Sequence, residues 1–299
     1  MISISIPDDF PPVFRGSSSY SELASFSDIR HFDSLPGSED ALIQRIRGSV
    51  GVLNIRASSK FTERVFASCP GLRIVSVWGT GTDHIDLGAA ARYGVRVTNT
   101  PGVSAVSIAE HAMALMLGAA RRLPVLDAAT RAGGWPRGQM VQLRGKTCGV
   151  IGLGAIGREF ARMAEGFGMR VVAWTMHPRA GDPVVELDDL YRTSDVISLH
   201  LRLSDQTEGL IGAREFGMMK SGAIFVNTAR GAIVDEGAMI AALQSGRISA
   251  GLDVFTVEPL SAENPLTSLS NVVITPHCAG ITPEALEAGL RMAVENLRV

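Results

Sequence analysis

The sequence predicts an α/β protein built from two successive parallel α/β units. Short β-branched or apolar runs alternate with helical patterns along almost the whole chain. These runs are apolar throughout, which is typical of strands buried on both faces of a parallel sheet. The alternation stops once, near residues 98–104, where Pro101 and Gly102 precede a long apolar helical stretch. We therefore expect the boundary between the two units there.

The first third of the chain contains four predicted strands and three predicted helices. The strand-like runs are "ISISI" (2–6), "VGVLNI" (50–55), "LRIVSVW" (72–78) and "VRVTNT" (95–100). The helical patterns are "SEDALIQRIRG" (38–48), "TERVFASCP" (62–70) and "DLGAAARYG" (86–94). Together they predict the first parallel sheet and its covering helices.

A long apolar helix is predicted from about residue 104 toward Leu126. Ser104 or Ser107 could cap it, because a serine hydroxyl accepts a hydrogen bond from the free N–H groups of the first turn. The glycine-rich turn "RAGGWPRGQ" (131–139) follows. The second sheet is then predicted from "TCGVIGL" (147–153), "MRVVAW" (169–174), "VISLHL" (196–201), "AIFVNTA" (223–229), "AGLDVF" (250–255) and "NVVITPH" (271–277).

Composition excludes several classes of partner. A formal net charge of −2, with no run of Lys or Arg, gives no signal for nucleic-acid binding. The opening "MISISIPDD" lacks the basic segment of a signal peptide, and the most apolar stretch (107–120) is too short to span a bilayer. Cys69, Cys148 and Cys278 show no metal-ligand spacing, so we expect no metal site and a reducing, cytoplasmic setting.

A glycine motif, "GVIGLGAIGREF" (149–160), predicts a dinucleotide site. Gly152, Gly154 and Gly157 follow a predicted strand and open a predicted helix, as the dinucleotide fingerprint requires. The three glycines would allow, in order, a tight turn, close approach of the pyrophosphate, and close packing of helix on strand. Free N–H groups at the start of the helix would bind the phosphates.

The next strand does not end in the acidic residue that normally binds the adenosine ribose. Thr175 stands at that point, followed by "MHPR". A neutral threonine can bind a hydroxyl and does not repel a 2′-phosphate, so both NAD and NADP remain open. Arg179 could pair with that phosphate, or it could be a solvated loop residue.

Three strands in the second half each run into a residue suited to catalysis: Arg230, Glu258 and His277. An imidazolium can donate a proton to a ketone oxygen, and a carboxylate on its other nitrogen would fix the tautomer. A guanidinium can hold a carboxylate and polarise the neighbouring carbonyl. With a nicotinamide nearby, the set predicts hydride transfer to a 2-keto acid. Singly, Glu258 could merely end a turn and Arg230 could be a surface charge.

These motifs resemble a known family. "GVIGLGAIGREFARMAEGFGMRVVAW", "FVNTARGAIVDE", "AGLDVFTVEP" and "TPHCAG" occur in the order and spacing of the D-isomer-specific 2-hydroxyacid dehydrogenases, and the likeness covers about Val50 to Asn296. It implies that Arg230 binds the substrate carboxylate, that His277 is the acid/base and that Glu258 is its partner. It also implies a Rossmann NAD(P)-binding domain (99–280) inserted in a flavodoxin-like substrate-binding domain (1–98 plus 281–299).

The resemblance implies further contacts. Beside the glycine loop, cofactor contacts are expected at Ala155, Ile156, Thr175, Thr207, Ala229, Asp253 and Gly280. Substrate contacts are expected at Arg56, Trp78, Gly79 and Thr80, whose "GTGTD" segment could instead be a plain loop capped by Asp83. His84 and His111 are expected to be structural.

The family also implies a homodimer that uses the apolar helix and the segment after it. The chain stops at Val299, shortly after its last helix, so docking of that helix is expected to be weak or completed by a partner subunit. The predicted reaction is hydride transfer between NAD(P)H and a small 2-keto acid or D-2-hydroxy acid, such as glyoxylate, hydroxypyruvate or a phosphoglycerate-like acid. The alternative is a cofactor-sensing binding protein related to corepressors, without significant turnover.

Overall fold

The computed structural model describes residues 1–298, which form two compact units. Unit 1 comprises Met1–Ser104 and the residues from Ile281 onward, and unit 2 comprises Ala105–Gly280. This division differs from the one predicted from sequence by the segment 99–104, which packs with unit 1. Val299, the last residue of the predicted split domain, lies outside the described residues.

Unit 1 contains a five-stranded parallel sheet in the order β2-β1-β3-β4-β5, the strand order of flavodoxin-like folds. Its strands are β1 (Ile2–Ile6), β2 (Ser27–His31), β3 (Gly51–Asn54), β4 (Ile74–Val77) and β5 (Arg96–Thr98). Its helices are α1 (Ser18–Phe26), α2 (Glu39–Ile46), α3 (Glu63–Ser68), α4 (Leu87–Arg92) and α11 (Pro283–Asn296). The sequence analysis missed α1 and β2, because the former is serine-rich and the latter is a polar strand at the edge of the sheet.

Successive strand residues in unit 1 point to opposite faces, and each face has its own core. Val52 packs with α2, α3 and α4, whereas Leu53 packs with α1 and α11. The expected weak docking of α11 is wrong: its Leu290, Ala293 and Val294 are fully buried in this second core. Apolar side chains on one face of the helix account for the difference.

Unit 2 contains a six-stranded parallel sheet in the order β11-β10-β9-β8-β6-β7. Its strands are β6 (Thr147–Ile151), β7 (Arg170–Trp174), β8 (Val196–Leu199), β9 (Ala223–Asn227), β10 (Ile248–Leu252) and β11 (Val272–Ile274). Val184 forms a single parallel bridge with Ala173 of β7. That bridge occupies the place of a third strand, so the order is that of a Rossmann sheet with this strand reduced to one residue.

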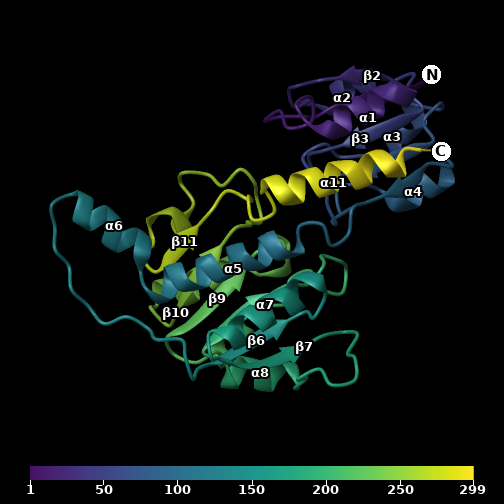
Figure 1. The fold of residues 1–299 in the computed structure, drawn as a ribbon. Helices are drawn as coiled ribbons and strands as arrows, with labels where there is room; N and C mark the ends of the chain where they lie inside the picture. The colour runs from purple at the N-terminus through teal and green to yellow at the C-terminus, as the bar shows by residue number, and fades with distance from the viewer. Residues whose placement is uncertain (299) are drawn as a thin grey trace. The chain divides into compact units, whose positions relative to one another are not determined.

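Helices cover both faces of the unit 2 sheet (Figure 1). On one face lie α5 (Ala105–Ala120) and α7 (Ala155–Gly166), and on the other lie α8 (Leu187–Thr193), α9 (Ala213–Met218) and α10 (Glu236–Gln244). Strand residues alternate between the two cores: Val150 and Val226 face the α5 side, whereas Ile151 and Phe225 face the other. Burial on both faces explains why the strands are apolar throughout.

The predicted long helix is interrupted, contrary to expectation. It ends at Ala120, and α6 (Leu123–Arg131) begins after Arg122, whose backbone is left-handed with φ 51°. Pro124 explains the break, because proline has no N–H to donate to the carbonyl four residues earlier. Of the two proposed caps, Ser107 lies inside α5 and therefore does not cap it.

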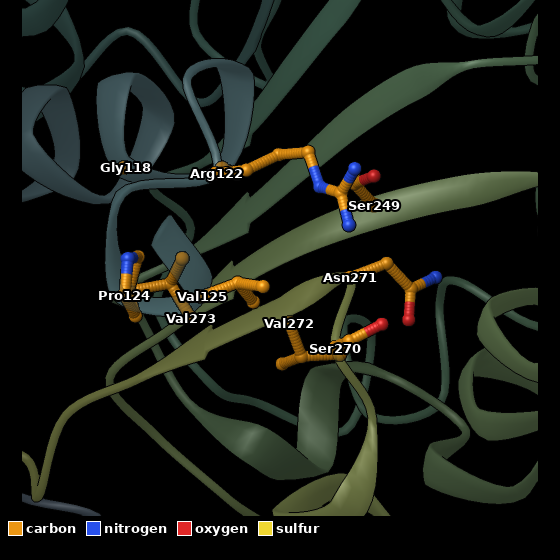
Figure 2. Close-up of a pocket in the computed structure, with 10 residues that line it drawn as sticks. Gly118, Arg122, Pro124, Val125, Ser249, Ser270, Asn271, Val272 and Val273 are labelled. Atoms are coloured by element: carbon orange, nitrogen blue, oxygen red, sulfur yellow. The ribbon is translucent and has the colours of Figure 1, made fainter. Parts of the chain in front are cut away.

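Helix α6 extends away from the unit 2 sheet and buries no residue (Figure 1). A small hollow of about 110 Å³ lies where α5 meets α6, beside the edge strand β11 (Figure 2). Arg122, Pro124 and Val273 are among its lining residues, and no predicted site residue is. This hollow is therefore separate from the candidate site.

Candidate active site

The glycine loop between β6 and α7 has the geometry of a phosphate cradle. Gly152 has φ 99°, and a Cβ there would lie 2.7 Å from the carbonyl oxygen of His200. A Cβ on Gly157 would lie 1.9 Å from the carbonyl oxygen of Gly152, so only glycine lets α7 start this close to the strand. Gly154 faces open space, with nothing within 4 Å of an added Cβ. The open position at the N-terminus of α7 fits a dinucleotide pyrophosphate, with exposed Ala155 and half-buried Ile156 in the first turn.

The loop after β7 contains one acidic residue, and the carboxylate of that residue is already paired. Asp182 accepts two hydrogen bonds from the Arg158 guanidinium, at 2.6 and 2.9 Å, and one from the Arg179 N–H at 2.8 Å. The Arg158 hydrogen bonds, and next that of Arg179, hold the pKa of Asp182 at about 2. Thr175 is half-buried at the end of the strand, and the Arg179 side chain is exposed.

Arg230, Glu258 and His277 follow β9, β10 and β11, three neighbouring strands of one parallel sheet. Their carboxyl ends share one edge of the sheet, where open α/β sheets bind ligands. The His277 Nδ1 and Glu258 Oε2 atoms lie 2.7 Å apart, and the two side chains are 41% and 36% exposed. The pair is thus formed and still reachable from solvent.

The protein itself holds Glu258 in its ionised form. Burial raises its pKa, but the hydrogen bond with His277, the N–H of Phe255 on Oε1 at 3.0 Å and the nearby charge of Arg230 outweigh that effect. The net pKa lies below the ordinary glutamate value. Because the carboxylate binds Nδ1, the other ring nitrogen, Nε2, can exchange a proton with a ligand.

Two residues that the sequence analysis missed shape the Arg230 turn. The Asn227 side chain accepts a hydrogen bond from the N–H of Ala229 and donates one to the carbonyl oxygen of Arg230, at 2.9 and 3.1 Å. Gly231 lies against the chain that leads to Glu258, since an added Cβ would be 2.0 Å from the carbonyl carbon of Phe255. The two turns are therefore fitted to each other, which a single sequence does not show.

The remaining predicted cofactor residues of unit 2 differ in exposure. Ala229 and Gly280 are half-buried, whereas Thr207 and Asp253 are buried. The Thr207 hydroxyl lies 2.7 Å from the carbonyl oxygen of Arg202, which stabilises its own turn. Their contacts with a cofactor stay predictions.

His200 directly follows β8, and its side chain is half-buried. Burial lowers its pKa to about 3, so the ring is neutral near pH 7. A general acid with that pKa would not hold its proton, and His277 is the better candidate among the described histidines of unit 2.

His111, Asp253 and Cys278 bring nitrogen, oxygen and sulfur atoms within 4.8 Å of one another. A metal would need the thiolate form of cysteine. Burial and next the Asp253 carboxylate raise the pKa of the Cys278 thiol. The observed contacts of this cluster are hydrogen bonds, with Thr275 between His111 and Asp253.

In unit 1, Arg56 and Trp78 lie together. The Arg56 guanidinium donates to the carbonyl oxygens of Phe10 and Pro11 at 2.9 and 2.7 Å, and its carbon lies 5.8 Å from the centre of the Trp78 ring. The Nε1–Cδ1 edge of the Trp78 indole packs on Gly289 of α11, where a Cβ would be 2.3 Å from the indole nitrogen. Trp78 is therefore held by packing.

The Gly79 N–H, a predicted donor to the substrate carboxylate, already donates to Thr100 Oγ1 at 2.8 Å. Gly79 has φ 132°, which favours glycine, and it is followed by half-buried Thr80. The predicted structural role of His84 matches its contact, because its Nε2 lies 2.7 Å from Asn54 Oδ1.

Comparison with known proteins gives the family. Residues 113–279 match the model described as "D-isomer specific 2-hydroxyacid dehydrogenase, NAD binding domain". The glyoxylate reductase of Aeropyrum pernix is 40% identical over 92% of this chain and 87% of that protein. The chain belongs to the D-isomer specific 2-hydroxyacid dehydrogenases.

Two further relatives extend the comparison. The D-3-phosphoglycerate dehydrogenase of Archaeoglobus fulgidus is 43% identical over 80% of this chain, which spans about half (47%) of that protein's length. A solved structure titled "Acyclic imino acid reductase (Bsp5) in complex with NADPH and D-Arg" matches with a TM-score of 0.91 and 29% identity, covering 99% of this chain and 96% of that one.

Family membership makes the chain an oxidoreductase of 2-hydroxy acids that uses a nicotinamide cofactor. It also agrees with the α/β fold class predicted from sequence. No helix among residues 1–298 is long and apolar enough to cross a membrane.

A buried carboxyl group in unit 1 leads to a testable pH dependence. Asp8 is fully buried and accepts hydrogen bonds from the N–H of Ile55 and the side chain of Asn54. Burial raises its pKa from 3.8 to about 6, despite these hydrogen bonds. Between the two values the folded state binds more protons than the unfolded state, so stability falls as pH rises.

We expect Asp8→Asn to remove that dependence. Since the two pKa values differ by an amount equivalent to about 3 kcal/mol, the free energy of unfolding of the wild type should fall relative to the variant by up to that amount between pH 4 and pH 7. Urea unfolding of both proteins across this range measures the effect. Parallel pH profiles for the two proteins would contradict it.

Proposed function

We propose that this protein reduces a small 2-keto acid to the corresponding D-2-hydroxy acid with NADH or NADPH. The observation that carries the proposal is the His277–Glu258 pair, which lies at the same sheet edge as Arg230 and is formed in the same unit as the glycine loop. The candidate substrates are glyoxylate, hydroxypyruvate and, for the reverse reaction, phosphoglycerate-like 2-hydroxy acids. The names of the Aeropyrum and Archaeoglobus relatives support this class.

In the proposed reaction, His277 Nε2 donates a proton to the keto oxygen. A nicotinamide cofactor, when bound, would supply the hydride for the keto carbon. The ionised Glu258 carboxylate accepts the Nδ1–H, so it orients the ring and stabilises its charged form before transfer. The product alcohol then contains the hydride on carbon and the histidine proton on oxygen.

Arg230 is proposed to bind the substrate carboxylate with two parallel hydrogen bonds and to polarise the adjacent keto group. Asn227 and Gly231 would fix its turn. We assign further substrate contacts to Arg56, Trp78, Gly79 and Thr80; at Gly79 the N–H would have to leave Thr100 Oγ1 in order to donate to the substrate carboxylate.

His277→Asn should lower kcat by about 10²–10⁴-fold, the usual contribution of a general acid, while NAD(P)H binding followed by fluorescence stays unchanged.

Arg230→Ala should instead raise the KM for the keto acid, by roughly 10- to 100-fold for the loss of a charged hydrogen-bonding partner. Steady-state kinetics on a panel of 2-keto acids separates the two effects.

Near wild-type turnover of His277→Asn would refute the proposed role. If the wild type bound NADH tightly yet reduced no acid in the panel, a cofactor-sensing binding protein would replace the enzyme as the better interpretation.

Cofactor choice is proposed to depend on the loop after β7. Its only acidic residue, Asp182, is neutralised by Arg158, so the loop offers Thr175 and the exposed Arg179 to the adenosine end. A 2′-phosphate would meet a cation there and no free carboxylate.

We expect Arg179→Ala to raise the KM for NADPH by about tenfold, as for the loss of one charged hydrogen bond, and to leave the KM for NADH within twofold. Arg192→Ala, which removes an exposed arginine of α8, is the matched control. A strong NADH preference of the wild type would exclude this role of Arg179.

We also propose a homodimer in a cytoplasmic setting. Helix α6 buries none of its residues within the chain, and Leu123 and Trp135 are 55% and 75% exposed. A surface of this kind favours association with a second copy. All three cysteines are free thiols, which supports a reducing compartment.

Light scattering should give twice the chain mass of 31.7 kDa. Replacing both apolar residues, as Leu123→Ser with Trp135→Ser, should shift the mass toward the monomer because it removes the apolar contact area. A monomeric wild type would rule the dimer out.

A further inference from the structure

The backbone of His277 has an unusual conformation. Its φ is 52°, in the left-handed region that residues with a Cβ seldom adopt. This conformation is strained for a residue other than glycine. Some other interaction must therefore hold the segment 275–279 in place.

The buried Asp253 supplies this interaction from both sides of His277. Its Oδ1 accepts hydrogen bonds from the Thr275 hydroxyl at 2.6 Å and from the N–H of Cys278 at 2.9 Å, and its Oδ2 accepts one from the N–H of Ala279 at 2.9 Å. Its backbone oxygen accepts the N–H of His277 itself, at 2.8 Å. These contacts clamp the residues before and after His277 to the end of β10.

The hydrogen positions of this cluster follow from the residue types. The Thr275 hydroxyl donates its single proton to Asp253 Oδ1. His111 Nε2 lies 2.9 Å from Thr275 Oγ1, and the hydroxyl has no second proton to give it. His111 must therefore be the donor, and its Nε2 must carry a proton.

His111 comes from a packed helix of unit 2. It lies in the first half of α5, which packs on β9, β10 and β11, and its side chain is 24% exposed. The chain of donors thus runs from His111 through Thr275 to Asp253, and it connects a packed helix to the loop of the proposed acid/base.

We propose that His111 is a positioning residue for His277. By donating to Thr275, it keeps the Thr275 hydroxyl pointed at Asp253, and the completed clamp holds His277 in its left-handed conformation with the ring against Glu258. His111 is expected to be structural, and in this proposal its structural role is to keep His277 in position. The inference rests on the proposed role of His277 as acid/base.

Three variants test the donor chain in the full-length protein. His111→Leu removes the donor, Thr275→Val removes the hydroxyl, and His111→Gln restores an N–H donor of similar reach. We expect the first two to lower kcat by tenfold or more, with the KM for the nicotinamide cofactor changed less than threefold and the melting temperature within a few degrees of wild type. On a logarithmic scale, His111→Gln should recover at least half of the kcat that His111→Leu loses. Thr193→Val, which removes a hydroxyl bonded to the Asp189 carbonyl in α8, is the matched control and should behave as wild type.

Wild-type kcat in either His111→Leu or Thr275→Val would overturn the inference, as would a folded His111→Gln as impaired as His111→Leu. If His111→Leu does not fold, Thr275→Val and His111→Gln decide by the same criteria. His277→Asn is assayed in parallel: if it stays active, the proposed function fails, whereas an inactive His277→Asn beside a fully active His111→Leu removes only the present inference.

Discussion

All strands of a parallel sheet end at the same edge, and the candidate site depends on that constraint. In unit 2 the ends of β9, β10 and β11 are neighbours. Residues separated by up to 47 positions in the chain, from Arg230 to His277, therefore lie at one edge of the sheet, and no additional helix or strand is needed to bring them there. The sheet can do this because both of its faces are covered and its strands need no polar residues before their ends. The chemistry therefore lies in the turns, and the core only places them.

Buried carboxylates arrange these turns in both units. Asp8 in unit 1 and Asp253 in unit 2 are fully buried, and each accepts hydrogen bonds from a loop after a neighbouring strand. A carboxylate accepts up to about four hydrogen bonds in fixed directions, so one buried acid can fix several backbone groups. The desolvation cost of such a group is large and is offset only when these hydrogen bonds are formed. Folding of the loops is therefore coupled to the formation of hydrogen bonds by the buried carboxylates.

Much of this was predictable from sequence, because apolar strands and the glycine motif depend on local residue patterns. The six strands of the second sheet, the glycine loop and the residues after three strands all follow from such patterns. Other features depend on tertiary contacts that one sequence does not reveal. The polar edge strand β2 is stabilised by pairing with β1, and Asn227 looks like any strand-end amide until its contacts with the Arg230 turn are seen. His111 has no sequence signal either, since its partner Thr275 lies 164 positions away.

The reduced third strand of the unit 2 sheet has a consequence for evolution and design. The loop from Thr175 to Val184 is attached to β7 by one bridge, with hydrogen bonds of Ala173 to Pro183 and Val185, and to α7 by the Arg158–Asp182 ion pair. A full strand would impose a side-chain register on this region, and a change of length would shift that register. With one bridge, residues can be exchanged or inserted in the loop while the sheet keeps its alignment. Selection for a new cofactor can therefore act on this loop almost independently of the stability of the domain that carries it.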